Sequence, residues 1–274
     1  MSGPNDGTLP RVIWMYWEQG LDNAPEVVKK CFESWHEQNP GWNVVMLDKA
    51  SASEYVDLGS LIGANYGRLT VQKRSNLLRL NLLARYGGVW ADATCFCNQP
   101  LDGWIHDYMK SGFFVFRDPG RGRIMSSWFM AALPGNHLVS SFGHQHNEYW
   151  RTNSFPDQKT KFRKFLVRLF RVMIGKHTDR QDYWLSFLAR RILRIHPYFI
   201  IHYHFAYHVR RDKQSKMIWD HIPYFNAGPA KILRKRLLGV EMSSKVQNAS
   251  AEAISPMSKL TWKKSLHIPD EASR

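Results

Sequence analysis

Near the N-terminus, a helical pattern lies between two short apolar runs. The runs are Arg11–Trp17 and Asn43–Leu47, and both are rich in strand-forming side chains. Between them, apolar residues recur at helical spacing over Val27–Trp35, until Asn39–Pro40–Gly41 ends the pattern. Two strands joined through a helix usually lie parallel in one sheet. This order therefore predicts an α/β fold with a partly parallel sheet.

A second such unit carries the most informative polar residue. Val71–Arg85 reads as an apolar helix that ends at Gly87–Gly88, and Val89–Phe96 follows as a strand. That strand is apolar except for Asp92 and Thr94. Ligands of open α/β sheets bind beyond the carboxyl ends of strands, so Asp92 could hold a divalent cation or accept hydrogen bonds from sugar hydroxyls. The alternative is a structural ion pair with Arg79, and both interpretations can hold together.

The chain divides into three parts by pattern. We expect an α/β core over residues 10–150, with further strands at Phe113–Phe116 and Trp128–Leu133 and a helix from Asn136 toward Trp150. We expect residues 151–242 to be mostly helical and basic, and residues 243–274 to form a C-terminal segment that returns to the site around Asp92.

The charge is strongly one-sided. Residues 1–150 hold 13 basic and 14 acidic residues, whereas residues 151–274 hold 25 and 9. Within the second part, Lys159–Lys176 has seven basic residues, no acid and one apolar face, which is typical of a helix lying on an anionic membrane. The alternative is that this apolar face packs on the protein's own core. No nucleic-acid motif accompanies the charge, so nucleic acid is not an expected partner.

The cysteine count and the N-terminus indicate the compartment. The three cysteines, Cys31, Cys95 and Cys97, form no disulfide framework, and the first ten residues contain no apolar signal region. We therefore expect a cytoplasmic protein that associates peripherally with the inner face of the cell membrane.

Several motifs in register resemble a known family. Ser75–Arg79 (SNLLR) followed by Ala84–Thr94 (ARYGGVWADAT) resembles the S-D-x-x-R…GG-x-x-x-D-x-D signature of glycosyltransferase family 32, which the clostridial glucosylating toxins share. The match is closer to the bacterial capsular polysaccharide synthesis branch, in which Thr commonly takes the second acidic position. Ile13–Gly20, Ala24–Trp35 and Lys259–Lys263 are similar to that branch in the same order. The resemblance implies a GT-A-like fold, a Rossmann-related sheet flanked by helices, with a mostly helical basic C-terminal region.

The resemblance also implies roles for individual residues. Asp92 and Arg79 would position the donor sugar as the catalytic pair, and Asp92 would lie at the metal. The nucleotide-binding residues would come from the first strand, the second helix, the strand that follows it and the C-terminal block: Trp14, Tyr16, Trp17, Gln19, Gly20, Ser75, Asn76, Gly88, Thr94, Lys259, Thr261 and Trp262.

Two departures from the family pattern concern the metal. Asn76 occupies the position where the family usually has Asp. Thr94, a weak neutral ligand, occupies the position of the carboxylate that usually ligates Mn²⁺. Whether the protein binds a divalent cation, Mn²⁺ or Mg²⁺, is therefore left open by the sequence. Lys259, Lys263 or basic residues of the second half could instead neutralise the leaving diphosphate.

The resemblance implies that a hexose passes from a nucleotide sugar, UDP-linked, to a saccharide acceptor in capsule or other surface polysaccharide synthesis, with retention of configuration. Acceptors in capsule synthesis are commonly attached to a lipid, so a lipid-linked acceptor is among the expected partners. The alternative is a catalytically degenerate GT-A-like binding protein at the membrane. A separate pattern, His202, His204 and His208, could bind zinc, although packing among aromatic residues is the commoner role.

Overall fold

The computed structural model describes residues 7–238 and 255–264, without residues 121, 176 and 178. Its centre is a five-stranded sheet in the order β2-β1-β3-β6-β5. The strands are β1 (Val12–Tyr16), β2 (Asn43–Leu47), β3 (Gly88–Ala91), β5 (Phe113–Arg117) and β6 (Met125–Ala132). β1 pairs parallel with β2 and β3, whereas β6 pairs antiparallel with β3 and β5. The expected α/β sheet with parallel strands is present, and within it β6 runs opposite to the other four strands.

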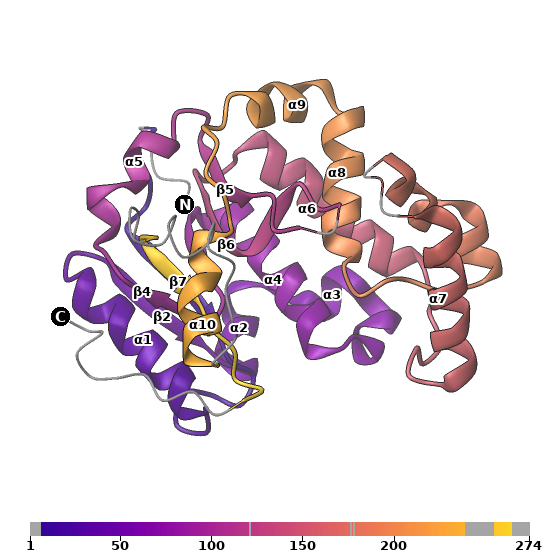
Figure 1. Cartoon of the computed structure of the whole chain (residues 1–274), viewed down its shortest axis with the longest axis horizontal. Coiled ribbons are helices and arrows are strands. Elements are labelled where there is room, and N and C mark those ends of the chain that lie inside the picture. The colour runs from indigo at the N-terminus through magenta and orange to yellow at the C-terminus, as the bar shows by residue number, and fades with distance from the viewer. Residues whose placement is uncertain (1–6, 121, 176, 178, 239–254, 265–274) are drawn as a thin grey trace.

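A second, two-stranded sheet joins distant parts of the chain. It consists of β4 (Cys95–Cys97) and β7 (Met257–Lys259), paired antiparallel with Cys95 opposite Lys259. Figure 1 shows β7 lying beside β4 near helix α1 (Glu26–Gln38).

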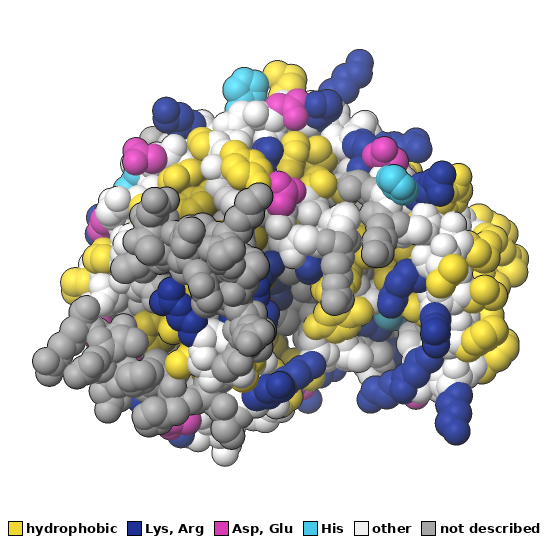
Figure 2. Space-filling model, in the orientation of Figure 1, with side chains coloured by type: hydrophobic (Ala, Val, Ile, Leu, Met, Phe, Trp, Pro, Cys, Tyr) yellow, Lys and Arg dark blue, Asp and Glu magenta, His cyan; other side chains and the backbone are white. Residues whose placement is uncertain are grey.

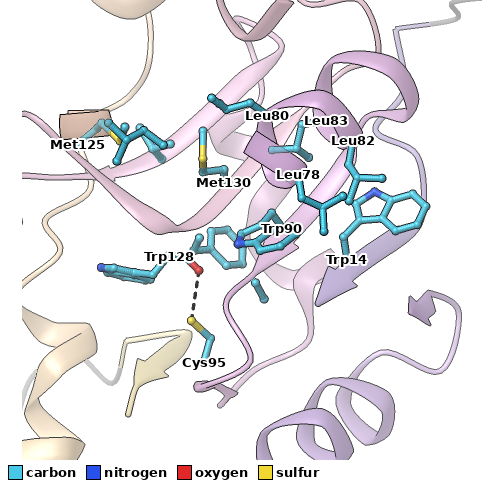
Figure 3. Packing of buried hydrophobic residues seen from close by; sticks show 14 of the residues in the cluster. Trp14, Leu78, Leu80, Leu82, Leu83, Trp90, Cys95, Met125, Trp128 and Met130 are labelled. Carbon is cyan, nitrogen blue, oxygen red and sulfur yellow. Dashed lines mark hydrogen bonds between the residues drawn. The ribbon is translucent and has the colours of Figure 1, made fainter. Parts of the chain in front are cut away.

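Helices cover both faces of the main sheet. On one face, Trp35 of α1 stacks on Phe129 of β6 and donates a hydrogen bond from Nε1 to the Cys95 carbonyl at 2.7 Å. On the other face, Met130 lies beside the leucines of α4 (Val71–Tyr86), as Figure 3 shows. Neighbouring residues of a strand point to opposite faces, so Phe129 and Met130 place one helix layer on each side.

The remaining elements follow in chain order (Figure 1). The short helices that lie between β2 and β5 in the sequence are α2 (Lys49–Tyr55), α3 (Leu58–Ile62), the 3-10 helices η1 (Gly63–Arg68) and η2 (Leu101–Gly103), and α5 (Ile105–Tyr108). The later part contains α6 (His137–Thr152), α7 (Lys161–Ile174), the 3-10 helix η3 (Asp179–Leu185), the π-helical turn η4 (Leu188–Ile192), α8 (Ile200–Arg211), α9 (Lys213–Asp220), η5 (Pro229–Lys231) and α10 (Ile232–Leu237). Within the described residues, the part after 150 is mostly helical, as expected.

Gly88 permits the close approach of β1 and β3. Its φ is +86°, and a Cβ atom there would lie 2.6 Å from the Val12 carbonyl oxygen and 2.5 Å from its side chain. Only glycine adopts this backbone conformation without strain and leaves that space free. Gly88 is therefore a packing residue inside the sheet rather than a ligand contact.

The predicted strand Val89–Phe96 is wrong as one element. β3 ends at Ala91, and Asp92, Ala93 and Thr94 form a turn before β4 begins at Cys95. The turn is closed by a 2.7 Å hydrogen bond from the Cys95 amide to the Asp92 carbonyl. The chain thus leaves the main sheet at Asp92 and enters the small sheet three residues later.

Candidate functional site

Asp92 lies at the carboxyl end of β3, next to the end of β1. Three side chains contact its carboxylate. Trp90 Nε1 donates a hydrogen bond to Oδ1 at 3.0 Å, and Lys259 Nζ donates one to Oδ2 at 3.0 Å. Arg79 forms an ion pair with it, with Nη2 3.1 Å from Oδ1. Burial alone would raise the pKa of Asp92, but attraction by Lys259 and Arg79 outweighs it and holds the pKa below its usual value. Asp92 is therefore a fixed carboxylate whose side chain remains 28% exposed.

Arg79 reaches Asp92 from α4 and is buried, with only 5% of its side chain exposed. Its other donors go to the Ser75 carbonyl at 3.2 Å, Ser75 Oγ at 3.1 Å and the Ser127 carbonyl, and its guanidinium lies 4.9 Å from the centre of the Trp90 ring. The ion pair that the sequence allowed between Arg79 and Asp92 is present. These contacts make Arg79 the residue that orients Asp92, while a direct contact of Arg79 with a donor sugar stays a prediction.

Lys259 reaches the same carboxylate from the C-terminal block. Its Nζ donates to Thr94 Oγ1 at 2.6 Å as well as to Asp92, and the Leu260 amide donates to the Thr94 carbonyl at 2.8 Å. Burial tends to lower the pKa of Lys259, but the Asp92 charge raises it above its usual value. Thr94, which is buried, is thus an acceptor for an ammonium group.

The aromatic residues expected at the nucleotide base divide into two groups. Trp14 is buried, donates from Nε1 to the Gly87 carbonyl at 2.9 Å and packs against Tyr55. Figure 3 shows its ring beside the α4 leucines. The expected base contact of Trp14 is therefore corrected to a core role, because its ring has no free face.

Trp17 and Trp262 lie together at the open edge of the sheet. Their ring centres are 5.7 Å apart at an interplanar angle of 82°, and Trp262 is 48% exposed. The Trp17 Nε1 atom is buried and has no hydrogen-bond partner among the described residues. Tyr16 is half-buried, and burial together with Glu18 raises its pKa to about 12. Trp17 and Trp262, which are far apart in the sequence, thus form an aromatic pair, and Trp262 follows Lys259 by three residues.

The other predicted residues lie around this edge with different contacts. Asn76 is half-buried, and its side chain makes no hydrogen bond within the described chain, so its amide is available. Ser75 accepts from Arg79. Gln19 is exposed beside Gly20, whose φ is +79°, and Thr261 Oγ1 accepts from the Lys263 amide at 3.3 Å.

Sequence reasoning missed one ion pair at this edge. Arg74 Nη2 lies 2.6 Å from Glu18 Oε1, and both side chains are largely buried, with 17% and 15% exposed. Burial lowers the pKa of Arg74, but its hydrogen bond to Glu18 more than reverses this. Their positions gave a usable signal, since Glu18 directly follows the first strand and Arg74 directly precedes Ser75.

The three histidines of the zinc alternative lie on α8 and have different partners. His202 Nδ1 lies 3.0 Å from the Met125 carbonyl, His204 Nδ1 lies 2.9 Å from His146 Nδ1, and His208 Nε2 lies 2.9 Å from Ser141 Oγ. Across the described chain, no three His, Cys, Asp or Glu side chains group as metal ligands. The three therefore do not converge on one ion, and burial lowers their pKa values, that of His202 to about 3.

Comparison with known families gives the context of this site. The family described as capsular polysaccharide synthesis protein matches residues 4–167. This chain belongs to that family. The match includes Trp17, Asn76, Arg79, Asp92 and Thr94 and ends before the C-terminal block, so Lys259 lies outside it.

Two relatives are similar to parts of this chain. The O-glycosyltransferase braB of Annulohypoxylon truncatum is 28% identical over 163 residues, 52% of this chain and 38% of that protein. The glycosyltransferase afumC of Aspergillus fumigatus is 31% identical over 103 residues, 34% of this chain and 26% of that protein. The chain spans well under two thirds of either relative's length.

A solved structure named PaToxG glycosyltransferase is also similar to this chain. It aligns with a TM-score of 0.43 at 13% identity, over 88% of this chain and 84% of that one.

Proposed function

We propose that this protein transfers a hexose from a nucleotide sugar, UDP-linked, to a saccharide acceptor in capsule or other surface polysaccharide synthesis, with retention of configuration. The observation that carries the proposal is Asp92, fixed as a carboxylate at the end of β3 and still partly exposed. The names of the relatives, O-glycosyltransferase and glycosyltransferase, support the same reaction class.

The proposed reaction needs positioning more than a protein nucleophile. The bond from the sugar's anomeric carbon to the diphosphate oxygen breaks, and its electron pair goes to that oxygen. The acceptor hydroxyl oxygen bonds to the anomeric carbon, and its proton passes to the released diphosphate. The protein contributes by aligning the two reactants and by stabilising the negative charge that develops on the leaving group.

The contacts around Asp92 suggest how the donor would lie. Asp92 would accept hydrogen bonds from the sugar hydroxyls, and the free amide of Asn76 would contact the ribose or the sugar. Trp17, Tyr16 and Trp262 would flank the base. Arg79 would act through Asp92, because its own donors are taken up by protein acceptors.

A screen of nucleotide sugars tests this function. We expect at least one UDP-sugar to raise the melting temperature of the protein. When no acceptor is present, the same UDP-sugar should be hydrolysed slowly, and mass spectrometry should detect the released UDP. Both measurements are made with and without Mn²⁺. If no nucleotide sugar binds, the proposal is wrong. Binding without hydrolysis or transfer would favour the alternative, a catalytically degenerate binding protein.

We further propose that the protein lies on an anionic membrane surface through α7, where a lipid-linked acceptor would be within reach. Only part of the helix's apolar face packs inward: Phe170 is buried and Leu166 is half-buried against the core. The rest forms an exposed apolar stripe, with exposed fractions of 45–73%: Phe162, Phe165, Leu169, Val172 and Met173. The alternative of a wholly packed face therefore does not describe this helix.

Basic side chains run beside the apolar stripe. Lys161, Lys164, Arg168 and Arg171 are exposed and form a basic row along the same helix. Phe187, Leu188 and Ile192 of the following segment add exposed apolar area, at 67%, 47% and 61%. Figure 2 shows apolar side chains at the right edge, where Figure 1 places α7, with Lys and Arg next to them. None of the described helices is both long and apolar enough to cross a membrane.

Vesicle binding tests the membrane proposal. Each basic residue near an anionic surface contributes about 1 kcal/mol, and apolar side chains inserted into the interface add to this. We expect the protein to cosediment with phosphatidylglycerol-containing vesicles and not to bind phosphatidylcholine vesicles. High salt should release the bound protein.

Two variants separate the contributions. Replacement of the basic row by Gln should abolish binding to anionic vesicles. The double variant Phe162→Ser with Phe165→Ser should weaken this binding, and the binding that is left should be more sensitive to salt. A control with the same charge change on other elements, Lys29, Lys49, Lys110 and Lys213→Gln, should bind like the wild type. Equal loss in the control would mean that net charge, not this helix, makes the contact.

A further inference from the structure

The residues at the D-x-T turn do not fit a divalent cation. Mg²⁺ and Mn²⁺ prefer about six oxygen ligands with carboxylates among them. Here Asp92 is the carboxylate, and Thr94 supplies only a hydroxyl. Both outward oxygens, Asp92 Oδ2 and Thr94 Oγ1, already accept hydrogen bonds from the ammonium group of Lys259, at 3.0 and 2.6 Å. Among the residues with described positions, no cluster of three acidic, His or Cys side chains supplies further ligands.

Charge opposes a metal at this position as well. Arg79 Nη2 lies 3.1 Å from Asp92 Oδ1, so one carboxylate already faces two positive groups. A divalent cation between Asp92 and Thr94 would have to displace Lys259 and would then be repelled by Arg79. A D-x-D motif would offer a second carboxylate to offset this repulsion, and Thr94 does not.

We propose that the Lys259 ammonium group is a built-in cation that takes the place of the divalent ion and neutralises the donor diphosphate. The inference deepens the proposed function and rests on it. Lys259 ends β7, whose pairing with β4 sets Lys259 directly opposite Cys95, three residues after Asp92. The ladder thus holds the positive charge at the turn before any ligand arrives.

Lys259 keeps the capacity to bind a phosphate oxygen. An ammonium group has three N–H donors, and its described contacts use two of them. Its side chain is 16% exposed and that of Asp92 is 28% exposed, so the pair opens toward solvent rather than into the core. Trp262, three residues further on, is exposed next to Trp17, where the base of the same nucleotide would lie.

Calorimetry with UDP tests the role toward the diphosphate. We expect the wild-type protein to bind UDP equally well, within about twofold, in EDTA and in Mn²⁺. Lys259→Met should weaken UDP binding by at least tenfold in both buffers, and Lys259→Arg should restore part of it. Lys264→Met, which removes an exposed lysine of the same segment, should bind UDP like the wild type. Melting curves of each variant check that the fold is retained.

A second measurement follows the metal alone, by the electron paramagnetic resonance signal of free Mn²⁺. The wild-type protein should leave the signal unchanged, and Thr94→Asp alone should bind Mn²⁺ weakly, because Lys259 still pairs with the carboxylates. Thr94→Asp combined with Lys259→Met should bind Mn²⁺ at least tenfold more tightly than Thr94→Asp alone.

The outcomes separate this inference from the proposed function. UDP binding that requires Mn²⁺, or tight Mn²⁺ binding by the wild type, overturns the built-in cation and leaves the sugar-transfer proposal standing. Failure to bind UDP in either buffer overturns the UDP-linked donor and with it the role of Lys259 toward the diphosphate.

Discussion

Asp92→Asn is expected to lower the rate of sugar transfer by more than tenfold. Asn has the size of Asp but no charge, and its amide nitrogen cannot accept the hydrogen bonds that Asp92 receives. Loss of a charged contact that forms in the transition state costs roughly 2–4 kcal/mol. The rate should be measured as release of nucleotide and formation of glycoside with the donor identified by the screen.

The structure adds a stability cost to this variant. Asp92 is the counter-ion of both Arg79 and Lys259, so Asn leaves two largely buried cations without their partner. The folded fraction at the assay temperature must therefore be measured alongside the rate. Asp102→Asn is a matched control, because Asp102 also pairs with an Arg and a Trp, Arg11 and Trp42, but is 44% exposed. A folded Asp92→Asn protein with more than about a tenth of the wild-type rate would remove Asp92 from the site.

Arg79→Met should lower the free energy of unfolding by about 3–5 kcal/mol, the range found when one partner of a buried ion pair is removed. The guanidinium joins α4 to the Ser127 carbonyl of β6 and to Asp92 at the end of β3. Methionine fills part of the volume, but it leaves the Ser127 carbonyl without this donor and Asp92 without one of its two positively charged partners. Urea unfolding followed by circular dichroism gives the change directly.

Arg85→Met serves as its control on the same helix. Arg85 is exposed and makes a 3.3 Å hydrogen bond to the Tyr55 carbonyl, so its loss should cost less than about 1 kcal/mol. Equal stabilities of the two variants would show that Arg79 is not a structural tie, and Asp92 would then have to be oriented by Trp90 and Lys259.

Much of the α/β core could be predicted because local patterns determine it. The apolar runs at β1 and β2 and the leucine-rich α4 have clear periods, and their bounds in the structure agree closely with the pattern. The prediction of a single strand over Val89–Phe96 is wrong at Asp92 for a physical reason. The run is apolar on both sides of the turn, so hydrophobicity does not mark the point where the chain changes sheets.

The site was predictable in its type but not in its partners. The Asp92–Arg79 pair follows from one helix and the next strand, which are close in sequence. Lys259 is 167 residues from Asp92, and only the pairing of β7 with β4 brings the two together. Trp14 shows the opposite limit, although it lies in the same aromatic run as Trp17. It is in the middle of β1, where the three central residues are all buried, and its indole donates a hydrogen bond to the Gly87 carbonyl inside the core.

The pairing of β4 with β7 also affects the order in which the molecule becomes functional. The main sheet is complete in sequence by Ala132, whereas β7 begins at Met257. Contacts between such distant segments form late in folding, because a long loop must close before they are gained. During synthesis, the central sheet can therefore assemble while Asp92 still lacks Lys259. Among the strands that the structure describes, β7 is the last to leave the ribosome, and its arrival completes the charge balance around Asp92.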